Sequence, residues 1–330
     1  MYRSRKENEM IRTIALVTPG GDAPGMNPAI RAVVRYAIFH GLKVKGIEHG
    51  FEGLIHGDII EMGLKSVSGI INRGGTILKT IRSRDFEKKR NRLIAYENLK
   101  REHVDALVVI GGDGSLRGAS VIAKETSLPV IHIPASIDND IPCTEETIGF
   151  DTAVNTALDA IDKIRDTASS HERIFIVEVM GREAGYLALE VGLTAGAEII
   201  LIPEHKMSLG EVCKKLREGI NRGKMSSIIV VAEGFGKASD IAKVVSRSLK
   251  VEVRVSVLGY IQRGGAPTAG SRRLALVLGA RAVSLLLKGD KNKMVGMEEG
   301  KIVATDFDKV LRSRKNIDFG DYRLAEKLSK

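Results

Sequence analysis

Short apolar runs alternate with amphipathic stretches along most of the chain. The runs "ALVVI" and "SIIVVA" are apolar throughout, which is typical of strands that are covered on both faces. Between such runs, helical spacing places Val154, Leu158 and Ile161 on one side and Asp159 and Asp162 on the other. The pattern therefore predicts strands and amphipathic helices in alternation.

The strands predicted from this pattern lie at residues 13–18, 44–48, 106–110, 130–133, 174–179, 199–202, 228–232 and 253–258. Alternation of strands and helices over about 300 residues predicts parallel sheets with right-handed crossovers. No low-complexity linker or internal repeat interrupts the alternation. The expected fold class is α/β, with two layers of the doubly wound kind.

Composition narrows the class of protein. A chain of 330 residues suits two domains of ordinary size, and 43% hydrophobic residues exclude disorder. Only Cys143 and Cys213 occur, which argues against a disulfide framework and against a cysteine zinc site. The start "MYRSRKENEMIR" has no apolar core, so it does not resemble a signal peptide. The apolar runs fall short of the ~20 residues that a membrane helix needs. We expect a cytoplasmic protein without a membrane partner.

The net charge of +10 suggests an anionic partner or simply a solvated basic surface. Sites for single-stranded nucleic acid usually combine basic residues with stacking aromatics. Here aromatic residues make up 4% of the chain, Trp is absent, and no basic stripe is interleaved with Phe or Tyr. Phosphorylated small molecules are therefore the favoured partners, and nucleic acid is not expected.

Three loops follow predicted strands, where ligands bind in doubly wound folds. The first, "TPGGDAPGMN", offers Gly20 and Gly21 and then a helix from about Asn27, whose free N–H groups favour anions. It is no Walker A loop, because no G-K-[ST] follows. Taken alone, a glycine pair is more often just a tight turn.

The second loop, "GGDGSLRGAS", again opens a helix with glycines and adds Asp113. One acid within a phosphate cradle favours Mg²⁺, which typically uses one or two carboxylates plus phosphate oxygens; the plainer alternative is a helix N-cap. The third loop, "PASIDNDI", holds Asp138 and Asp140, two acids that repel each other. Three such loops at one sheet edge predict a single site.

The chain resembles the 6-phosphofructokinase family from about Thr13 to the 260s. Long motifs carry the resemblance: "GGDAPGMN", "INRGGT", "VVIGGDGS", "IDNDI", "IGFDTA", "RDTASSHER", "VEVMGR" and "GYIQRGG". The resemblance implies transfer of the γ-phosphoryl group of ATP, with Mg²⁺, to the 1-hydroxyl of fructose 6-phosphate. It also implies two Rossmann-like doubly wound domains of the phosphofructokinase type, in a homotetramer whose sites lie between subunits.

The same resemblance predicts the domain limits. An ATP-binding domain would comprise residues 1–147 and about 262–311. A sugar-phosphate-binding domain would comprise residues 148–261 and about 312–330.

The resemblance also assigns roles in catalysis and ATP binding. Asp138 is the expected base that takes the proton from the sugar hydroxyl, Asp113 is the metal-associated acid, and Asp140 supports the metal-facing side. Phe51 is placed beside the adenine. The residues expected to bind ATP are Gly21, Arg82, Ser83, Gly112, Asp113, Gly114 and Ser115.

The sugar phosphate would be held mainly by residues of the second half. The expected set is Ser136, Ile137, Asp138, Arg173, Met180, Gly181, Arg182, Glu233, Arg254, Tyr260 and Arg263. Within it, the resemblance assigns Arg173 and Arg254 to a neighbouring subunit's site. Tyr260 stands where the family often has His. Its side chain carries no charge, so the 6-phosphate loses one positively charged contact.

Two positions indicate the phosphoryl donor. Pyrophosphate-using relatives usually carry Asp at the position of Gly114 and Lys at that of Ala135. Gly114 leaves room for the α-phosphate, so ATP is favoured over the alternative, a pyrophosphate-dependent phosphofructokinase. Lipid and NAD kinases share "GGDG" but lack "IDNDI" and "MGR". A regulatory, non-catalytic homologue is disfavoured because Asp113, Asp138, Arg82 and Arg182 are all retained.

An effector site is expected by resemblance, for a nucleoside diphosphate or phosphoenolpyruvate. Its residues would be Arg31, Arg35, Arg165, Gly196, Glu198, Arg222 and Lys224, with Arg222 replacing a usual Lys. The familiar "RYSVSD" is "LKSVSG" here, which changes Leu64, Lys65 and Gly69. Lys65 supplies a point charge without the bidentate geometry of Arg. The sequence predicts that the effector pocket is retained, but it does not predict how the activity responds to an effector.

Overall fold

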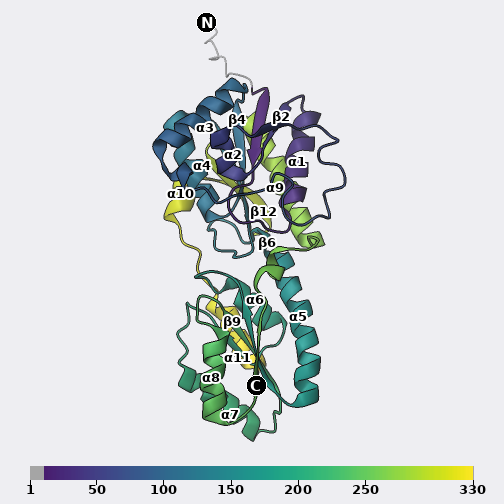
Figure 1. Ribbon diagram of the computed structural model, residues 1–330, viewed down its shortest axis with the longest axis vertical. Coiled ribbons are helices and arrows are strands. Elements are labelled where there is room, and N and C mark those ends of the chain that lie inside the picture. Colours follow the sequence, from purple (N-terminus) through teal and green to yellow (C-terminus); the bar gives the residue numbers. More distant parts are fainter. Residues whose placement is uncertain (1–10, 330) are drawn as a thin grey trace. The chain divides into compact units, whose positions relative to one another are not determined.

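The computed structural model describes residues 11–329, in two compact units (Figure 1). Of the described residues, the first unit comprises 11–136, Ile141–Gly149 and Arg263–Lys315; the second comprises Ile137–Asp140, Phe150–Gln262 and 316–329. The basic extension at residues 1–10, whose role the sequence left open, lies outside the described residues. The ligand roles predicted for the two domains, and their predicted limits, stay predictions.

The first unit is built on an eight-stranded sheet in the order β12-β11-β5-β4-β1-β2-β3, with β6 paired to β5. The strands are β1 (Thr13–Val17), β2 (Lys43–Ile47), β3 (Ile59–Glu61), β4 (Ala106–Gly111), β5 (Val130–Ser136), β6 (Ile148–Gly149), β11 (Lys293–Glu298) and β12 (Lys301–Asp306). Its helices are α1 (Met26–Phe39), α2 (Gly50–His56), η1 (Asp85–Glu87), α3 (Lys89–Arg101), α4 (Asp113–Thr126), α9 (Ala269–Leu287) and α10 (Phe307–Arg312). Central β1 and β4 are buried along their whole length, as their uniformly apolar sequences predict.

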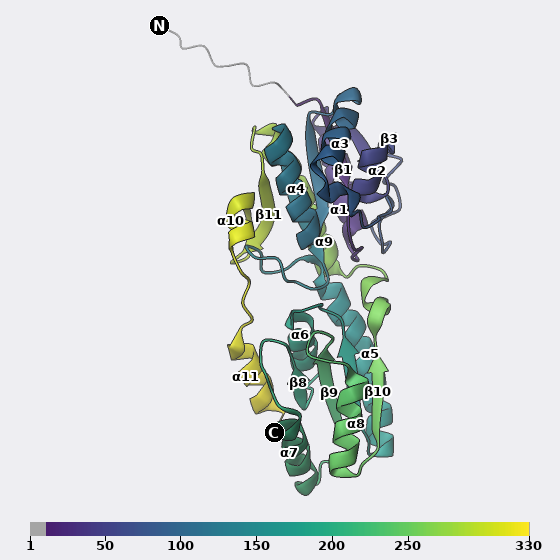
Figure 2. The same cartoon turned by 60° about the vertical axis from the view of Figure 1, so that its left-hand side comes forward.

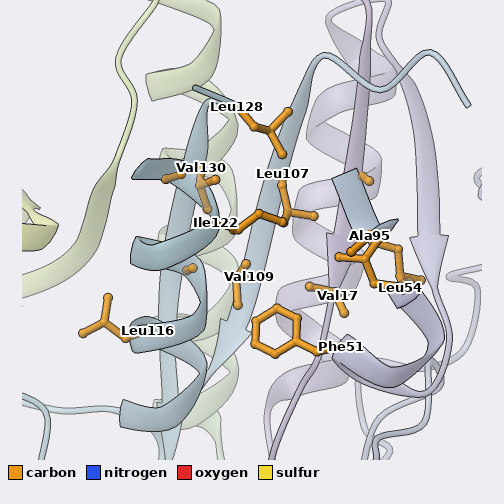
Figure 3. Close-up of a cluster of buried hydrophobic side chains, with 14 of the residues drawn as sticks. Val17, Phe51, Leu54, Ala95, Leu107, Val109, Leu116, Ile122, Leu128 and Val130 are labelled. Carbon is orange, nitrogen blue, oxygen red and sulfur yellow. The ribbon is translucent and has the colours of Figure 1, made fainter. Parts of the chain in front are cut away.

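Helices cover both faces of this sheet. On one face, side chains of α2, α3, α4 and α10 pack with alternate residues of β1 and β4. Figure 3 shows part of this cluster, with Ile122 of α4 beside Leu107 of β4. Helices α1 and α9 pack against each other and against the sheet from the other face. The carboxyl ends of β1, β4 and β5 are therefore held by a rigid, closely packed core.

The second unit has a four-stranded parallel sheet in the order β10-β7-β9-β8. Its elements are α5 (Phe150–His171), β7 (Ile174–Val179), α6 (Tyr186–Thr194), β8 (Ile199–Leu201), α7 (Leu209–Asn221), β9 (Ser227–Ala232), α8 (Ala238–Leu249), β10 (Val253–Val257), η2 (Gly259–Arg263, whose last residue belongs to the first unit) and α11 (Phe319–Leu328). Helices α7 and α8 pack on one face, through a second core of Ile, Val and Leu side chains. Helices α5 and α6 contact the strands from the other face (Figure 2).

The predicted strands are all present, but the expectation of wholly parallel sheets is wrong in the first unit. Strand β3 pairs antiparallel with β2, and β12 pairs antiparallel with β11. These additions lie at the two edges of the sheet, where a strand can be exposed on one side.

Among the described helices, none combines the length and apolarity that a membrane crossing requires. Both cysteines are free thiols.

His132 lies at the centre of β5 and has no solvent exposure. Burial lowers the pKa of this imidazole to about 3, so it stays neutral in the folded protein. Backbone groups of Gly111 and Gly112 lie close enough to the ring to oppose this shift in part, although neither ring nitrogen makes a hydrogen bond of regular geometry to a described residue. In the unfolded chain the imidazole recovers a pKa near 6.5 and binds a proton below that pH. Acid should therefore favour unfolding between about pH 6.5 and pH 3.

We expect His132→Phe to reduce this acid sensitivity. Between pH 7 and pH 5 the wild type should lose about 2 kcal/mol more free energy of unfolding than the variant, because only the wild type gains a proton on unfolding. Urea titrations of both proteins at the two pH values, at one protein concentration, measure the difference. Equal losses would show that His132 does not titrate in this window.

Candidate active site

The glycine loops of the first unit meet at the ends of β1 and β4. Ser115, in the first turn of α4, donates its hydroxyl proton to the carbonyl oxygen of Pro19 at 2.8 Å. This hydrogen bond holds the loop after β1 against the N-terminus of α4. Two adjacent loops thereby present backbone N–H groups near one helix N-terminus, which is the arrangement that binds phosphate.

A third segment, residues 72–84, is fastened to the same place. The Asn27 side chain donates to the carbonyl oxygens of Arg73 and Gly74 and accepts from the N–H of Ile77. Thr80 donates its hydroxyl proton to the carbonyl oxygen of Gly20 at 2.7 Å. Arg82 follows directly and is exposed, while Ser83 accepts the N–H of Phe86. Arg82 is thus an exposed cation next to an anchored glycine loop.

Asp113 is the first residue of α4, where a carboxylate is favoured by the helix dipole. Its Oδ2 accepts a hydrogen bond from Nε of Arg117 at 2.9 Å, and this bond raises the pKa of Arg117. Between residues 11 and 329 no group of three or more His, Cys, Asp or Glu side chains could hold a metal ion. One carboxylate beside a phosphate cradle nevertheless fits Mg²⁺, which keeps waters and takes phosphate oxygens as ligands.

Gly114 faces open space, because a Cβ built there meets no atom within 4 Å. Ala135, by contrast, is 1% exposed at the end of β5. A carboxylate at position 114 would fit sterically, so its effect on a nucleotide would be one of charge.

Arg263 lies in the first unit, although it was predicted to contact the sugar phosphate. Its Nη2 is 2.7 Å from Oδ1 of Asp22, and its Nε donates to the carbonyl oxygen of the same residue. The guanidinium therefore belongs to the loop after β1. Asp22 is a functional candidate that the sequence reasoning missed, although it stands within the quoted "GGDAPGMN" motif.

In the second unit, Asp138 is 5% exposed and forms an ion pair with Arg182, whose Nε is 3.2 Å from Oδ2. Between the two acids, Asn139 has a φ of 52°, a left-handed conformation that Asn tolerates better than most residues. The amide residue in "DND" thus has a backbone role.

Asp140 lies near Tyr186, whose pKa is raised to about 12 by burial and by the charges of Glu204 and Asp140. Tyr186 therefore remains a neutral hydroxyl.

Glu233 fixes the turn that carries Arg182. Its Oε1 accepts the N–H of Gly181 at 3.2 Å and that of Arg182 at 2.7 Å. Arg182 has a φ of 53°, unusual for a non-glycine residue, so the turn needs this support. A Cβ on Gly181 would lie 2.6 Å from the carbonyl oxygen of Ala184, and one on Gly234 would lie 2.2 Å from that of Arg182. Both glycines are needed for the close approach of these backbone segments.

Arg173 and Arg254 lie together, but far from Arg182 along the sheet. Both pair with Glu252: Nε of Arg173 is 2.7 Å from Oε2, and Nη2 of Arg254 contacts Oε1. Arg173 precedes β7, and Arg254 lies beside Phe175 at the start of β7. Arg182 follows the other end of β7, whose six residues span about 20 Å. One hexose phosphate cannot contact both ends.

The remaining predicted substrate residues lie near the ends of strands. Ser136 ends β5 and accepts the Thr147 hydroxyl proton on its carbonyl oxygen at 2.6 Å; Ile137 is buried. Met180 is half-buried directly after β7, and Tyr260 is 78% exposed in η2.

Phe51, predicted to lie beside the adenine, is only 7% exposed and stacks on Phe86 with ring centroids 4.0 Å apart. The structure therefore gives little support to an adenine contact by Phe51.

Five residues of the predicted effector set come together in the second unit. Arg165 donates to the carbonyl oxygens of Ala195 and Gly196, at the end of α6. Glu198 lies 2.9 Å from Nζ of Lys224 and 4.0 Å from Nη1 of Arg165. Nε of Arg222 donates to the carbonyl oxygen of Glu218. Arg31 and Arg35 lie on α1 of the first unit, away from this group in the sequence and in a separate unit.

Comparison with known proteins identifies the relatives of the chain. The phosphofructokinase family model matches residues 13–286. A protein of Thermoanaerobacter sp. (strain X514) named ATP-dependent 6-phosphofructokinase is 52% identical over 320 residues, which cover 97% of this chain and 100% of the relative. A protein of Brevibacillus brevis with the same name is 52% identical over 319 residues, with the same coverage.

Among solved structures, phosphofructokinase from Saccharomyces cerevisiae matches with a TM-score of 0.87 and 33% identity. The match covers 96% of this chain and 48% of the yeast chain, so this chain spans about half the length of that protein. The predicted fold class, α/β of the phosphofructokinase type, is confirmed by this likeness.

Proposed function

Because the chain belongs to the phosphofructokinase family, we propose that it is an ATP-dependent 6-phosphofructokinase. It transfers the γ-phosphoryl group of ATP to the 1-hydroxyl of fructose 6-phosphate and forms fructose 1,6-bisphosphate, a step of glycolysis. The relatives' name supplies the reaction. In this chain, the observation that carries the proposal is the buried carboxylate of Asp138, ion-paired with Arg182 after the end of β5.

Asp138 acts as the base in this proposal. It orients the sugar hydroxyl and accepts its proton as the new P–O bond forms. Arg182 keeps the carboxylate in place before the substrate binds, and Glu233 holds Arg182 through two backbone N–H groups. Phosphoryl transfer depends mainly on positioning and on electrostatic stabilisation. This chain supplies both through side chains whose backbone is fixed.

The first unit would bind ATP through the glycine loops, Arg82 and the N-terminus of α4. Asp113 is the residue that would hold Mg²⁺ together with phosphate oxygens. Its carboxylate also pairs with Arg117. The metal, when bound, neutralises negative charge on the phosphates. Arg263, paired with Asp22, is a second cation beside the same loop.

The sugar phosphate would be shared between two chains. Arg173 and Arg254 lie at the opposite end of β7 from Arg182, which supports their assignment to a neighbour's site. We infer a homotetramer that completes each site in this way. A cytoplasmic location is likewise proposed, since both substrates are phosphorylated metabolites. The residues around Glu198 form the proposed effector site, together with Arg31 and Arg35 of another chain.

The test of the proposal compares phosphoryl donors. ATP should support turnover of fructose 6-phosphate at least ~100-fold better than pyrophosphate in kcat/KM, a gap of about 2.7 kcal/mol. The reason is that Gly114 leaves the space beside the loop open to a nucleotide. A coupled assay that detects fructose 1,6-bisphosphate with each donor measures the ratio. Equal turnover would contradict the assignment of ATP as the donor.

Gly114→Asp and Gly114→Asn separate charge from size at this position. The two side chains are similar in size, and Asp is favoured in the first turn of a helix, so the fold should persist. Asp should lower kcat/KM for ATP at least ~10-fold more than Asn, through repulsion of the phosphates. Equal losses would assign the effect to size alone.

A further inference from the structure

His132 lies in the core of the first unit, on the face of the sheet that α4 covers. In the register of the sheet it is paired with Val109 of β4 on one side and with Met294 of β11 on the other. Residues paired in this way point to the same face of a sheet. Both neighbours belong to the cluster that α4 helps to form, in which Figure 3 labels Val109. The imidazole therefore belongs to this face, where it is fully buried.

An imidazole is an unusual side chain for an apolar core. A neutral imidazole has one donor and one acceptor nitrogen. Both nitrogens of His132 are buried without a hydrogen bond of regular geometry to any residue that the structure describes. A buried polar atom without a partner costs free energy, and an apolar side chain of similar size would avoid that cost. The stability of the core therefore does not explain why a histidine stands here.

Polar groups close to the ring belong to the glycine loop at the end of β4. Gly111 lies two residues beyond Val109, so it is on the same face and about 7 Å further along the strand. The backbone groups of Gly111 and Gly112 raise the pKa that burial lowers, as hydrogen-bond acceptors do for a histidine. In the backbone the acceptor is the carbonyl oxygen. That of Gly112 already accepts the N–H groups of Ser115 and Leu116, so the carbonyl of Gly111 is the better acceptor for the ring.

The carbonyl of Gly111 shares its peptide unit with the N–H of Gly112, the residue directly before α4. In a trans peptide the C=O and N–H groups point in opposite directions. A donor that holds the carbonyl from the core side therefore keeps the N–H directed away from the core, at a helix N-terminus suited to anions. The carbonyl oxygen has two lone pairs, so it can accept this bond in addition to one in the sheet. A hydrogen bond at the carbonyl also strengthens the N–H of the same unit as a donor.

We propose that His132 is a positioning residue for the phosphates of ATP: its imidazole donates to the carbonyl oxygen of Gly111 and thereby directs the N–H of Gly112 towards the phosphate. The inference rests on the proposed function, and it adds to the site a residue that does not touch the nucleotide. A phosphate at the N–H and His132 at the carbonyl favour the same orientation of this peptide unit. The hydrogen bond of His132 therefore takes regular geometry when the nucleotide binds.

His132→Leu and His132→Gln separate this role from packing, because the two new side chains are similar in size but only Gln can donate a hydrogen bond. The probe is the ATP analogue with an imido group between the β- and γ-phosphates, titrated calorimetrically in the presence of Mg²⁺. His132→Leu should bind it at least ~10-fold more weakly than the wild type, which is the effect of about one hydrogen bond. His132→Gln should bind it at least ~3-fold more tightly than His132→Leu, since the donor is restored. In both variants the KM for fructose 6-phosphate should stay within about twofold of the wild-type value.

Urea unfolding at pH 7 provides a second readout, which packing alone would order differently. Leu leaves no polar atom in the core, whereas Gln buries an amide with incomplete hydrogen bonding. His132→Leu should therefore be the more stable of the two variants, although it binds the analogue more weakly. Val130→Ala is the matched control, because it removes buried apolar volume from the same strand and the same cluster. It should lose stability but keep the wild-type affinity for the analogue.

The proposal is overturned if His132→Leu binds the analogue as the wild type does, or if His132→Gln binds it no better than His132→Leu. It is also overturned if Val130→Ala loses as much affinity as His132→Leu, because a weakened core would then account for both losses. A wild type that does not bind the analogue would overturn the positioning role together with the proposed function. A wild type that binds the analogue but does not phosphorylate fructose 6-phosphate with ATP would contradict the proposed function alone.

Discussion

Asp138→Asn should lower kcat by roughly 10²–10⁴-fold, because the amide keeps the shape of the side chain but cannot accept the proton of the sugar hydroxyl. The KM for ATP should barely change, since Asp138 is proposed to act on the sugar hydroxyl and not on the nucleotide. Loss of the ion pair with Arg182 should raise the KM for fructose 6-phosphate modestly, because that guanidinium is then less well placed. Steady-state kinetics with each substrate varied in turn measures both parameters.

Asp159→Asn is the matched control. Asp159 is an exposed acid of α5, paired with Lys163 four residues later. Its replacement removes the same charge from the same unit, and should leave kcat within about twofold of the wild type. A decrease of less than about fivefold in Asp138→Asn would contradict the role of Asp138 as base. A comparable decrease in Asp159→Asn would assign the effect to net charge.

The fold was predictable wherever strands are buried on both faces. Strands β4 and β9 are uninterrupted apolar runs, and both were found where expected. The missed elements are of another kind. Strand β3 has three residues and β6 two, and β12 lies at an edge with its first two residues exposed. Strand β11 was missed as well, and only its residues 294–296 are buried. Edge strands contain a mixture of apolar and polar residues. Their pairing depends on tertiary contacts that the local sequence pattern does not encode.

The candidate site was predictable as a set of positions but not as a set of contacts. The resemblance to the family assigned Asp138 and Arg182 to one site, and the structure brings them into an ion pair. The Asp113–Arg117 pair could have been read from the sequence, since helical residues four apart face each other. The two ion pairs of Glu252 with Arg173 and Arg254 could not be predicted from the sequence. They depend on the alignment of β10 with β7.

Arg173→Ala/Arg254→Ala should raise the KM for fructose 6-phosphate by about 10³-fold, with the KM for ATP nearly unchanged. Loss of one charge-assisted partner of a phosphate costs a few kcal/mol, so about 2 kcal/mol for each Arg gives this factor. Glu252 is left without either partner and adds repulsion. Tyr260 makes the dependence stronger, since its side chain carries no positive charge. Lys243→Ala/Arg247→Ala serves as control and should leave both KM values unchanged.

Mixing distinguishes a shared site from one built within a single chain. The Arg173→Ala/Arg254→Ala protein keeps Asp138 and Arg182, whereas Asp138→Asn keeps both arginines at the other end of β7. If the arginines serve a neighbour, random reassociation of equal amounts should give about a quarter of the sites Asp138 from one chain and both arginines from another. Those sites should recover the low KM of the wild type, although each parent protein lacks it or lacks turnover. Mixed oligomers with no such recovery would mean that each chain binds the sugar phosphate with its own residues. The roughly 20 Å between the two ends of β7 argues against that outcome, because a hexose phosphate is too short to bridge them.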